Sequence, residues 1–194
     1  MISIVTAICL GICLSAACGL RVFIPFLVVS IAAKCGLLEL RDSWHWIGSW
    51  PAITAFSTAT VLEITAYYVP WLDNALDSIA TPAAGIAGML MTVAVMPADV
   101  SPLYSWRIGI IGGGSVATGV QLVTVGARAL STASTGGAAN HVVSTAEAAG
   151  SICISAAAVF VPVVIAALVV LCLSLASWFV IKKGAGVFYR RKPA

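Results

Sequence analysis

Four ionisable side chains interrupt long apolar runs of the sequence and are its best candidates for chemistry. An isolated charge in apolar surroundings is costly, so such residues persist where they pair with one another or line a polar cavity. Arginine and glutamate together have two uses: they form a site for a polar or anionic solute, or they clamp helices as structural ion pairs. Both uses remain open here for Arg21, Glu63, Arg128 and Glu147.

Three more residues are secondary candidates. Asp73 and Asp77 are four residues apart and share one face of any short helix there, where they would bind a cation or relay a proton. The alternative is a solvated position at a membrane boundary, which the neighbouring Trp71 favours. His141 comes six residues before Glu147 and is a third side chain able to exchange a proton or act as a ligand.

Other kinds of chemistry find no support in the pattern. Cys9 and Cys13 share a helix face, but no His or carboxylate completes a metal-ligand set with them. The glycine run at 112–114 has no Lys after it, so it is not a phosphate-binding loop. A nucleophile–His–acid arrangement is also missing from the sequence. We therefore expect no enzymatic activity, no metal and no cofactor.

Composition indicates that these residues lie in a membrane protein. The chain is 61% hydrophobic and only 9% charged, with a mean hydropathy of +1.08, whereas soluble domains carry about 25% charged residues. One bilayer crossing needs roughly 20 apolar residues. We predict an all-α fold: a polytopic transmembrane helix bundle of five or six helices with broken or re-entrant segments, forming a single domain over residues 1–194.

Prolines and polar loops divide the chain into apolar segments. Pro25 cannot donate a backbone hydrogen bond to the carbonyl of Arg21, so the first helix should break or kink there. The polar segment 71–77 is expected at the membrane interface, and Asn140 is expected to cap the helix that carries Glu147. Helices are predicted over residues 2–20, 51–69, 82–96 and 108–130.

The last part of the chain leaves the number of crossings open. Residues 148–181 carry no charge, and one helix of that length would measure about 51 Å, against a hydrocarbon core of about 30 Å. Two helices meeting near Pro162 would solve the length problem. However, no polar turn separates them, and unsatisfied backbone groups are costly in lipid. Five and six crossings are both consistent with the sequence.

Basic residues gather in the tail, residues 182–194. By the positive-inside rule this cluster predicts a cytoplasmic C-terminus, in contact with lipid headgroups rather than nucleic acid. The expected partners are the lipid bilayer, a small polar solute, and either further copies of the chain or a partner in a membrane complex. Five of the ten Lys and Arg residues form the cluster: Lys182, Lys183, Arg190, Arg191 and Lys192.

A weak internal repeat relates two halves, residues 1–97 and 107–181. Each half holds a Gly-x-Arg sequence that ends in Arg21 or Arg128, and each supplies one glutamate. If three crossings separate the two Gly-x-Arg helices, these helices run in opposite directions. That is the pattern of an inverted-topology repeat, which is common among transporters.

Four stretches taken together are similar to a family of bacterial membrane proteins: residues 19–25; Glu63 with residues 70–73 and 77; residues 82–85; and residues 128–147. They resemble domain of unknown function family 4126. The sequence departs from the family pattern at Tyr67, Tyr68, Thr81, His141 and Ala148, where other members often carry charges or a proline. The resemblance implies a multi-pass protein of the bacterial cytoplasmic (inner) membrane and implies no activity.

Two functional hypotheses follow from the sequence. The first is a small transporter or permease for a polar or anionic solute, with the four buried Arg and Glu side chains around a central site. The alternative is a non-transporting membrane scaffold or accessory subunit, in which the same side chains are structural clamps. A polar cavity that reaches the arginines favours the first hypothesis, and dry Arg–Glu contacts favour the second.

Overall fold

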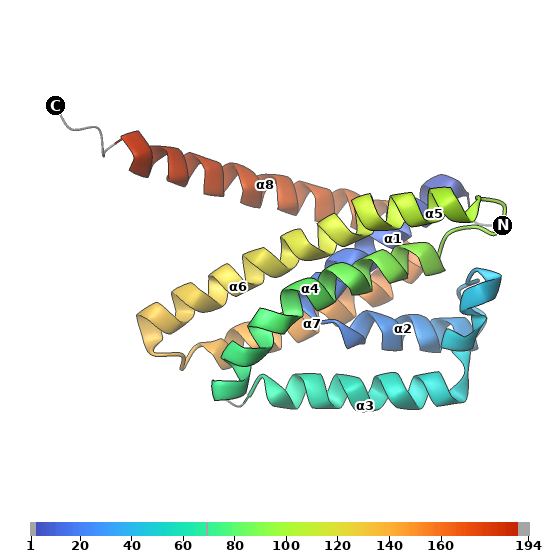
Figure 1. The fold of residues 1–194 in the computed structure, drawn as a ribbon, viewed down its shortest axis with the longest axis horizontal. Coiled ribbons are helices and arrows are strands. Elements are labelled where there is room, and N and C mark those ends of the chain that lie inside the picture. Colours follow the sequence, from blue (N-terminus) through green and yellow to red (C-terminus); the bar gives the residue numbers. More distant parts are fainter. Residues whose placement is uncertain (1–2, 69, 190–194) are drawn as a thin grey trace.

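The computed structural model describes residues 3–68 and 70–189, except for the side chains of residues 70–78, 179–181 and 183–189. Over these residues the fold is all-α, as predicted, with a short 3-10 helix (η1) and a π-helix (η2) between the α-helices (Figure 1). The elements are α1 (Ile4–Leu20), α2 (Phe23–Lys34), η1 (Asp42–Gly48), α3 (Trp50–Ala66), α4 (Pro70–Ala94), α5 (Pro102–Ile108), η2 (Gly109–Gly114), α6 (Ser115–Thr135), α7 (Asn140–Phe160) and α8 (Pro162–Tyr189).

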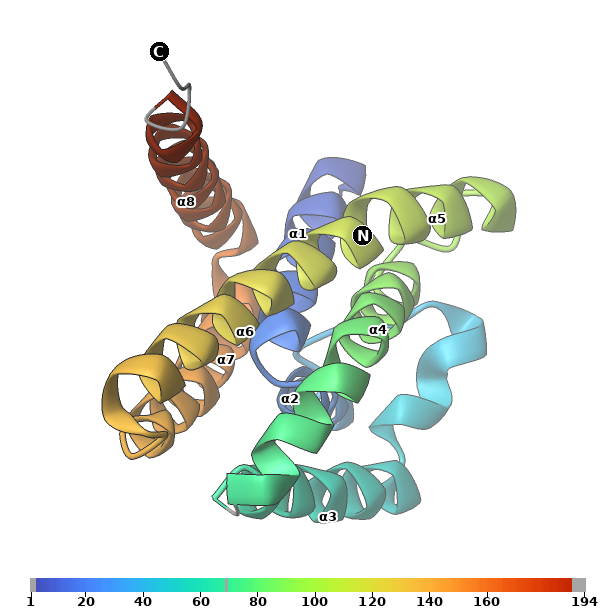
Figure 2. The ribbon, with the colours of Figure 1, turned by 60° about the vertical axis from the view of Figure 1, so that its left-hand side comes forward.

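Helix α1 lies at the centre of the bundle and packs against α4, α6, α7 and α8. Small side chains, among them Ala7, Cys13 and Ala17, are fully buried on it and let the neighbouring helices approach closely. Helix α2 leaves the tip of α1 and returns toward the end of the molecule where the chain begins, so that the two form a V (Figures 1 and 2). Helices α3 and α7 pack along α2.

The break between α1 and α2 falls at Arg21. This residue has extended backbone angles (φ −148°, ψ 128°), and α2 begins two residues later. Pro25 therefore sits in the first turn of α2, where a missing backbone N–H disrupts no helical hydrogen bond. The predicted interruption is confirmed, but the chain reverses direction there instead of kinking.

A second break separates α7 from α8 at Val161, whose φ of −135° and ψ of 59° end the helix before Pro162. At the break, the Val161 N–H still donates to the Ala157 carbonyl at 2.9 Å, the Ile165 N–H donates to the Val161 carbonyl at 3.2 Å, and the Cys13 thiol of α1 donates to the Pro162 carbonyl at 3.5 Å. The helical hydrogen bonds thus continue up to Val161 and resume from it, so the break needs no polar turn. Of the two alternatives for residues 148–181, the two-helix one is confirmed.

Three predicted boundaries are wrong. Pro82 lies inside α4, which runs from Pro70 to Ala94, because prolines are tolerated in helices whose neighbours compensate for the lost hydrogen bond. The expected loop before residue 108 is largely helical, since α5, η2 and α6 form one continuous path over Pro102–Thr135. Asn140 begins α7 instead of capping it, and its Nδ2 donates to Thr132 Oγ1 at 3.0 Å.

The described residues form eight α-helices, more than the five or six predicted, because the breaks at Arg21 and Val161 divide apolar segments. The reversal at Arg21 also changes the relative direction of later helices. Figure 1 shows α1 and α6 starting at the same end of the molecule and running the same way. The structure therefore does not support an inverted-topology repeat, because the two Gly-x-Arg helices are parallel.

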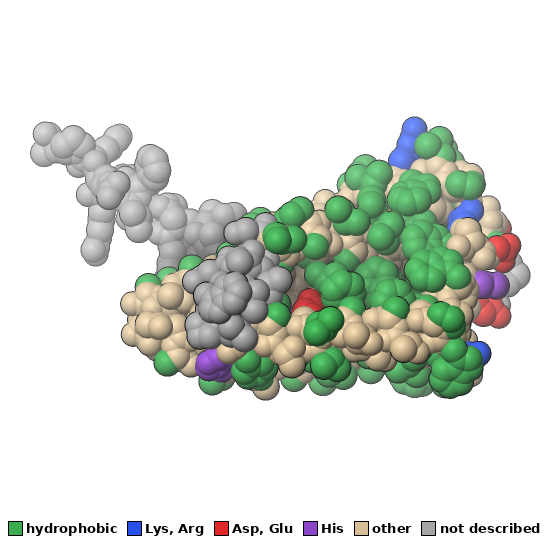
Figure 3. Space-filling view, turned by 60° about the horizontal axis from the view of Figure 1, so that its bottom comes forward, with side chains coloured by type: hydrophobic (Ala, Val, Ile, Leu, Met, Phe, Trp, Pro, Cys, Tyr) green, Lys and Arg blue, Asp and Glu red, His purple; other side chains and the backbone are tan. Residues whose placement is uncertain are grey.

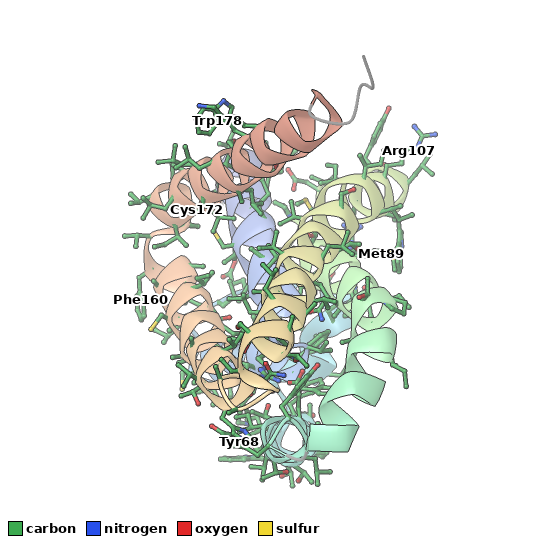
Figure 4. The ribbon with its side chains drawn as sticks, turned by 90° about the vertical axis from the view of Figure 1, so that its left-hand side faces the viewer. Tyr68, Met89, Arg107, Phe160, Cys172 and Trp178 are labelled. Atoms are coloured by element: carbon green, nitrogen blue, oxygen red, sulfur yellow. The ribbon has the colours of Figure 1, made fainter. Side chains whose placement is uncertain are left out.

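Helices α6 and α7 bury polar side chains and expose apolar ones. The buried face of α6 carries Gln121, Thr124 and Arg128, while Leu122 and Leu130 are exposed. The buried face of α7 carries four polar residues and a glutamate, while its exposed residues from Ala146 onward are apolar; Figure 4 shows Phe160 directed away from the bundle. The buried polar residues of α7 are Asn140, Ser144, Glu147, Ser151 and Ser155.

Two helical segments are long and apolar enough to cross a membrane: Pro102–Thr135 and Asn140–Phe160. Figure 3 shows one face of the molecule covered mainly by hydrophobic side chains, with most of the charged ones gathered at one end. Shorter apolar helices surround the two long ones: Ile4–Leu20, Phe23–Lys34, Ile79–Ala94 and Pro162–Trp178.

The close contact between α1, α4 and η2 depends on glycine residues, which have no side chain. A Cβ at Gly113 would overlap with the Gly88 carbonyl, Thr92 Oγ1 and Ser15 Oγ. At this point Ser15 Oγ donates to the Gly88 carbonyl at 2.8 Å and lies 2.9 Å from Thr92 Oγ1. The π-helical turn thus places a glycine where a hydrogen-bonded pair of hydroxyls already fills the space.

We expect Gly113→Ala to lower the free energy of unfolding by about 1–3 kcal/mol, the usual cost of forcing an extra methyl group into a packed core. The adjacent Gly112→Ala is the matched control, because a Cβ there meets no heavy atom within 4 Å. The measurement is the thermal unfolding midpoint of each purified variant in detergent. Equal midpoints for the two variants would show that the close approach at η2 contributes nothing to stability.

Candidate functional site

One carboxylate, that of Glu147, lies between two arginines. Arg21 Nη2 is 3.2 Å from Glu147 Oε2, and Arg128 Nε donates to Glu147 Oε1 at 3.2 Å. Arg128 Nη2 also pairs with Glu147 Oε2, so that Arg128 binds this carboxylate through two nitrogens. The side chains of Arg21, Arg128 and Glu147 are only 1%, 3% and 5% exposed. We call these three residues the charged cluster.

Three separate features of the fold bring the charged cluster together. Arg21 projects from the break that ends α1, Arg128 continues the buried polar face of α6, and Glu147 lies on the buried polar face of α7. One turn before Glu147, Ser144 accepts from Arg21 Nη2 through its carbonyl at 3.0 Å and also through its hydroxyl. The chain break and two helix faces therefore determine the position of each charge.

An aromatic ring completes the charged cluster. Tyr67, at the C-terminal end of α3, is 5% exposed, and its ring centroid lies 3.8 Å from Arg21 Cζ and 4.1 Å from Arg128 Cζ. Guanidinium groups at this distance are attracted by the electron-rich face of an aromatic ring, and the attraction strengthens when water is excluded. Tyr67 thus links α3 to the helices that carry the two arginines.

Glu63 has different partners from Glu147. Its Oε1 accepts from the backbone N–H of Val22 at 2.8 Å, and its Oε2 accepts from that of Phe23 at 3.1 Å. These amides belong to the N-terminal end of α2, where the first N–H groups have no helical acceptor. Glu63 is also within electrostatic reach of Arg21 and Arg128. All four predicted site residues therefore converge, although Glu63 binds backbone amides and Glu147 binds side chains.

The formal charges of the four residues balance, and the charged cluster is held by direct contacts. Two arginines face two glutamates, and the described contacts of Glu147 are direct, without space between the groups. Two cavities, of about 830 and 370 Å³, lie elsewhere, at the end of the molecule that holds η1 and the loop before α5. Neither cavity is lined by a residue of the charged cluster or by Glu63.

Among the secondary candidates, the described contacts of His141 lie outside this arrangement. The exposed His141 ring stacks on the Tyr68 ring, with centroids 5.4 Å apart and planes 7° from parallel. Tyr68 Oη in turn lies 2.7 Å from Thr145 Oγ1, on the outer side of α7; Figure 4 labels Tyr68 near the end of α3. Asp73 and Asp77 lie on α4, and their side chains fall outside the described residues.

Sequence reasoning missed Tyr67 and Ser144 as members of the site. A spacing signal for both was present: Tyr67 follows Glu63 by four residues, and Ser144 precedes Glu147 by three. Residues three or four apart share one helix face, so any partner of either glutamate is also close to its helical neighbour. For metal binding, no group of three His, Cys, Asp or Glu side chains capable of holding an ion occurs among the described residues.

We expect Glu147→Gln to destabilise the protein more than Arg128→Met does. The first change leaves two buried arginines close together without their shared carboxylate, whereas the second leaves the Arg21–Glu147 pair intact. Breaking a buried ion pair typically costs about 3–5 kcal/mol. The double variant Arg128→Met/Glu147→Gln restores the balance of charge and should recover part of the loss. Thermal unfolding of all three variants measures this, and strictly additive losses would contradict it.

Comparisons with known proteins bear on the identity of the chain. Neither a search of curated proteins nor a search of solved structures gave a match. The model of one family, described as domain of unknown function (DUF4126), matches residues 8–182. The match spans the helices that carry Arg21, Glu63, Arg128 and Glu147. Since it covers most of the sequence, the chain belongs to the DUF4126 family.

Proposed function

We propose that this chain is a multi-pass α-helical protein of the bacterial cytoplasmic membrane. The supporting observation is the reversed polarity of α6 and α7, which bury Gln, Thr, Asn, Ser and charged side chains and expose Leu, Val and Phe. In water such exposed apolar faces would favour association. Lipid is a suitable solvent for them, and it requires the polar groups to find partners inside the bundle. The basic tail then favours a cytoplasmic C-terminus.

Within the membrane, the charged cluster acts as a clamp, and the protein serves as a non-transporting scaffold or accessory subunit. Three features support this function over transport. The arginines are almost completely buried, they contact Glu147 directly, and neither described cavity touches them. Such a clamp joins α1, α6 and α7, and Tyr67 extends it to α3. A rigid bundle of this kind suits a protein whose task is to hold a partner in the membrane.

Transport of a polar or anionic solute is the second candidate, and one specific observation favours it. Helices α1 and α2 are shorter apolar pieces that meet at Arg21, next to a glutamate. Transporters place broken helices of this kind around their substrate sites, because the helix ends offer free backbone groups. Arg21 Nε and Nη1 make no hydrogen bond within the described structure.

The membrane assignment predicts that the full chain stays in the membrane pellet after extraction with alkaline carbonate and is released by detergent. The physical reason is that the exposed apolar side chains of α6, α7 and α8 have no other cover in the described structure. Immunoblotting of pellet and supernatant measures the distribution. Release by carbonate alone would place the chain on the membrane surface or outside the membrane, and would contradict the proposal.

The clamp function predicts that liposomes containing the purified chain are as tight as protein-free liposomes to protons, chloride, formate and phosphate. The measurement is ion flux under an imposed gradient and membrane potential. If the wild type carries a flux, and Arg21→Ala and Glu63→Gln each abolish it, the clamp function is overturned. Transport, the second candidate function, is then established. The matched control is Glu39→Gln. Glu39 is exposed and has no described contact with the charged cluster.

A further inference from the structure

The larger cavity, of about 830 Å³, lies at the end of the molecule where η1 meets the loop before α5, and charged side chains of both signs line it. Figure 3 shows positive, negative and histidine side chains together at this end. Its volume is within the range of small-molecule sites, about 300–1,000 Å³. The lining residues that can carry a charge are Lys34, Glu39, Arg41, Asp42, His45 and Asp99.

These charges do not neutralise one another. Among the residues that the structure describes, the ion pair in this cavity joins His45 to Asp42 at 4.0 Å, and it exists only when the imidazole is protonated. Glu39, Asp99 and Lys34 take part in no ion pair with any described residue. Unpaired charges of both signs around one space are complementary to a ligand that itself carries both signs.

Arg41 is the cation that the fold fixes in the wall of this cavity. Its Nη1 donates to the carbonyls of Pro97 and Val100 at 3.3 and 3.0 Å and to Ser105 Oγ at 3.0 Å. These contacts hold the guanidinium group in place but supply no negative charge. No hydrogen bond is described for its Nε and Nη2, and the side chain is only half-buried. The two remaining nitrogens can therefore bind a phosphate group as a fork.

Arg41 also lines the smaller cavity, of about 370 Å³, whose character is different. Trp44, Trp46 and Trp106 form much of the wall of this second cavity. Tryptophan is enriched at the membrane–water interface, the depth at which lipid headgroups meet the acyl chains. One arginine thus joins a charged cavity to an aromatic one, in the order in which the head and the tail of a phospholipid follow each other.

We propose that the two cavities together bind one zwitterionic phospholipid whose head carries a primary ammonium group, as that of phosphatidylethanolamine does. Arg41 and Lys34 bind its phosphate, Glu39 and Asp99 accept from its ammonium group, and the start of an acyl chain lies against the tryptophans. A head with only negative charge would meet unpaired carboxylates, and a quaternary ammonium group has no N–H to donate to them. The inference rests on the proposed membrane location and adds a lipid partner to it.

The test is native mass spectrometry of the purified full chain in detergent. The chain is titrated with an equimolar mixture of dioleoyl phosphatidylethanolamine, dioleoyl phosphatidylcholine and dioleoyl phosphatidylglycerol. Their acyl chains are identical, so a difference in binding reports on the headgroup alone. We expect one bound phosphatidylethanolamine per chain, with an apparent affinity about threefold or more above that of the other two lipids, as partly exposed ion pairs allow.

Three variants assign this preference to the cavity. Glu39→Gln/Asp99→Asn removes two exposed carboxylates without described partners, and it should lower phosphatidylethanolamine binding to the level of phosphatidylglycerol. Arg41→Lys keeps the charge but loses the fork, and it should weaken the binding of all three lipids. The matched control is Arg107→Gln, because Arg107 is exposed at the same end of the molecule and lines neither cavity. This control should keep the preference of the wild type.

Equal binding of the three lipids by the wild type would overturn the proposal, and so would a preference that survives Glu39→Gln/Asp99→Asn. Glycerophosphoethanolamine, the same head without acyl chains, should displace the bound lipid much less well than dihexanoyl phosphatidylethanolamine does. Equal displacement would identify the ligand as a free zwitterion and overturn the lipid proposal. Carbonate extraction tests the membrane location by itself, so a chain that stays in the pellet but shows no headgroup preference contradicts this inference alone.

Discussion

The pairing of Glu147 with both arginines is the interaction on which the rest of the bundle depends. Two charges about 4 Å apart attract each other by about 4 kcal/mol at an effective dielectric constant of 20. Placing a single charge at the centre of a bilayer costs about 2.5–3.5 kcal/mol on insertion scales. One glutamate can therefore support one buried arginine easily, but a second arginine at the same site adds its own cost and repels the first. The neighbouring charge of Glu63, within electrostatic reach of both arginines, lowers this cost.

The same constraint explains why a helix can break inside the bundle. Ending α1 at Arg21 leaves the first amides of α2 without helical acceptors, which is costly away from water. Glu63 accepts from two of these amides and at the same time balances the charge of the arginines. The break, the second arginine and Glu63 are thus mutually dependent. Their arrangement also requires α3 to run beside α2, and Tyr67 on α3 contacts both guanidinium groups.

The convergence of the four charged residues could be predicted from the sequence, because isolated buried charges require partners whatever the topology. The direction of the helices could not. Pro25 marks an interruption, but the same proline fits a kink and a reversal, and only the packing of α2 against α3 and α7 decides between them. Tyr67 was missed for a similar reason: an aromatic residue near a helix end is typical of a membrane interface, and only the positions of Arg21 and Arg128 give it a buried role.

The two glutamates lie in the same site and are equal in charge, yet they bind different kinds of partner. Glu147 binds two buried arginine side chains directly, and breaking a buried ion pair typically costs about 3–5 kcal/mol. Glu63 accepts hydrogen bonds from two backbone amides, which carry only the partial positive charge of a helix N-terminus. Exposure follows the same division, since Glu147 is buried and Glu63 is half-buried. The site therefore consists of a buried part, in which Glu147 holds the arginines of two chain segments together, and a half-buried part, in which Glu63 closes the N-terminal end of α2.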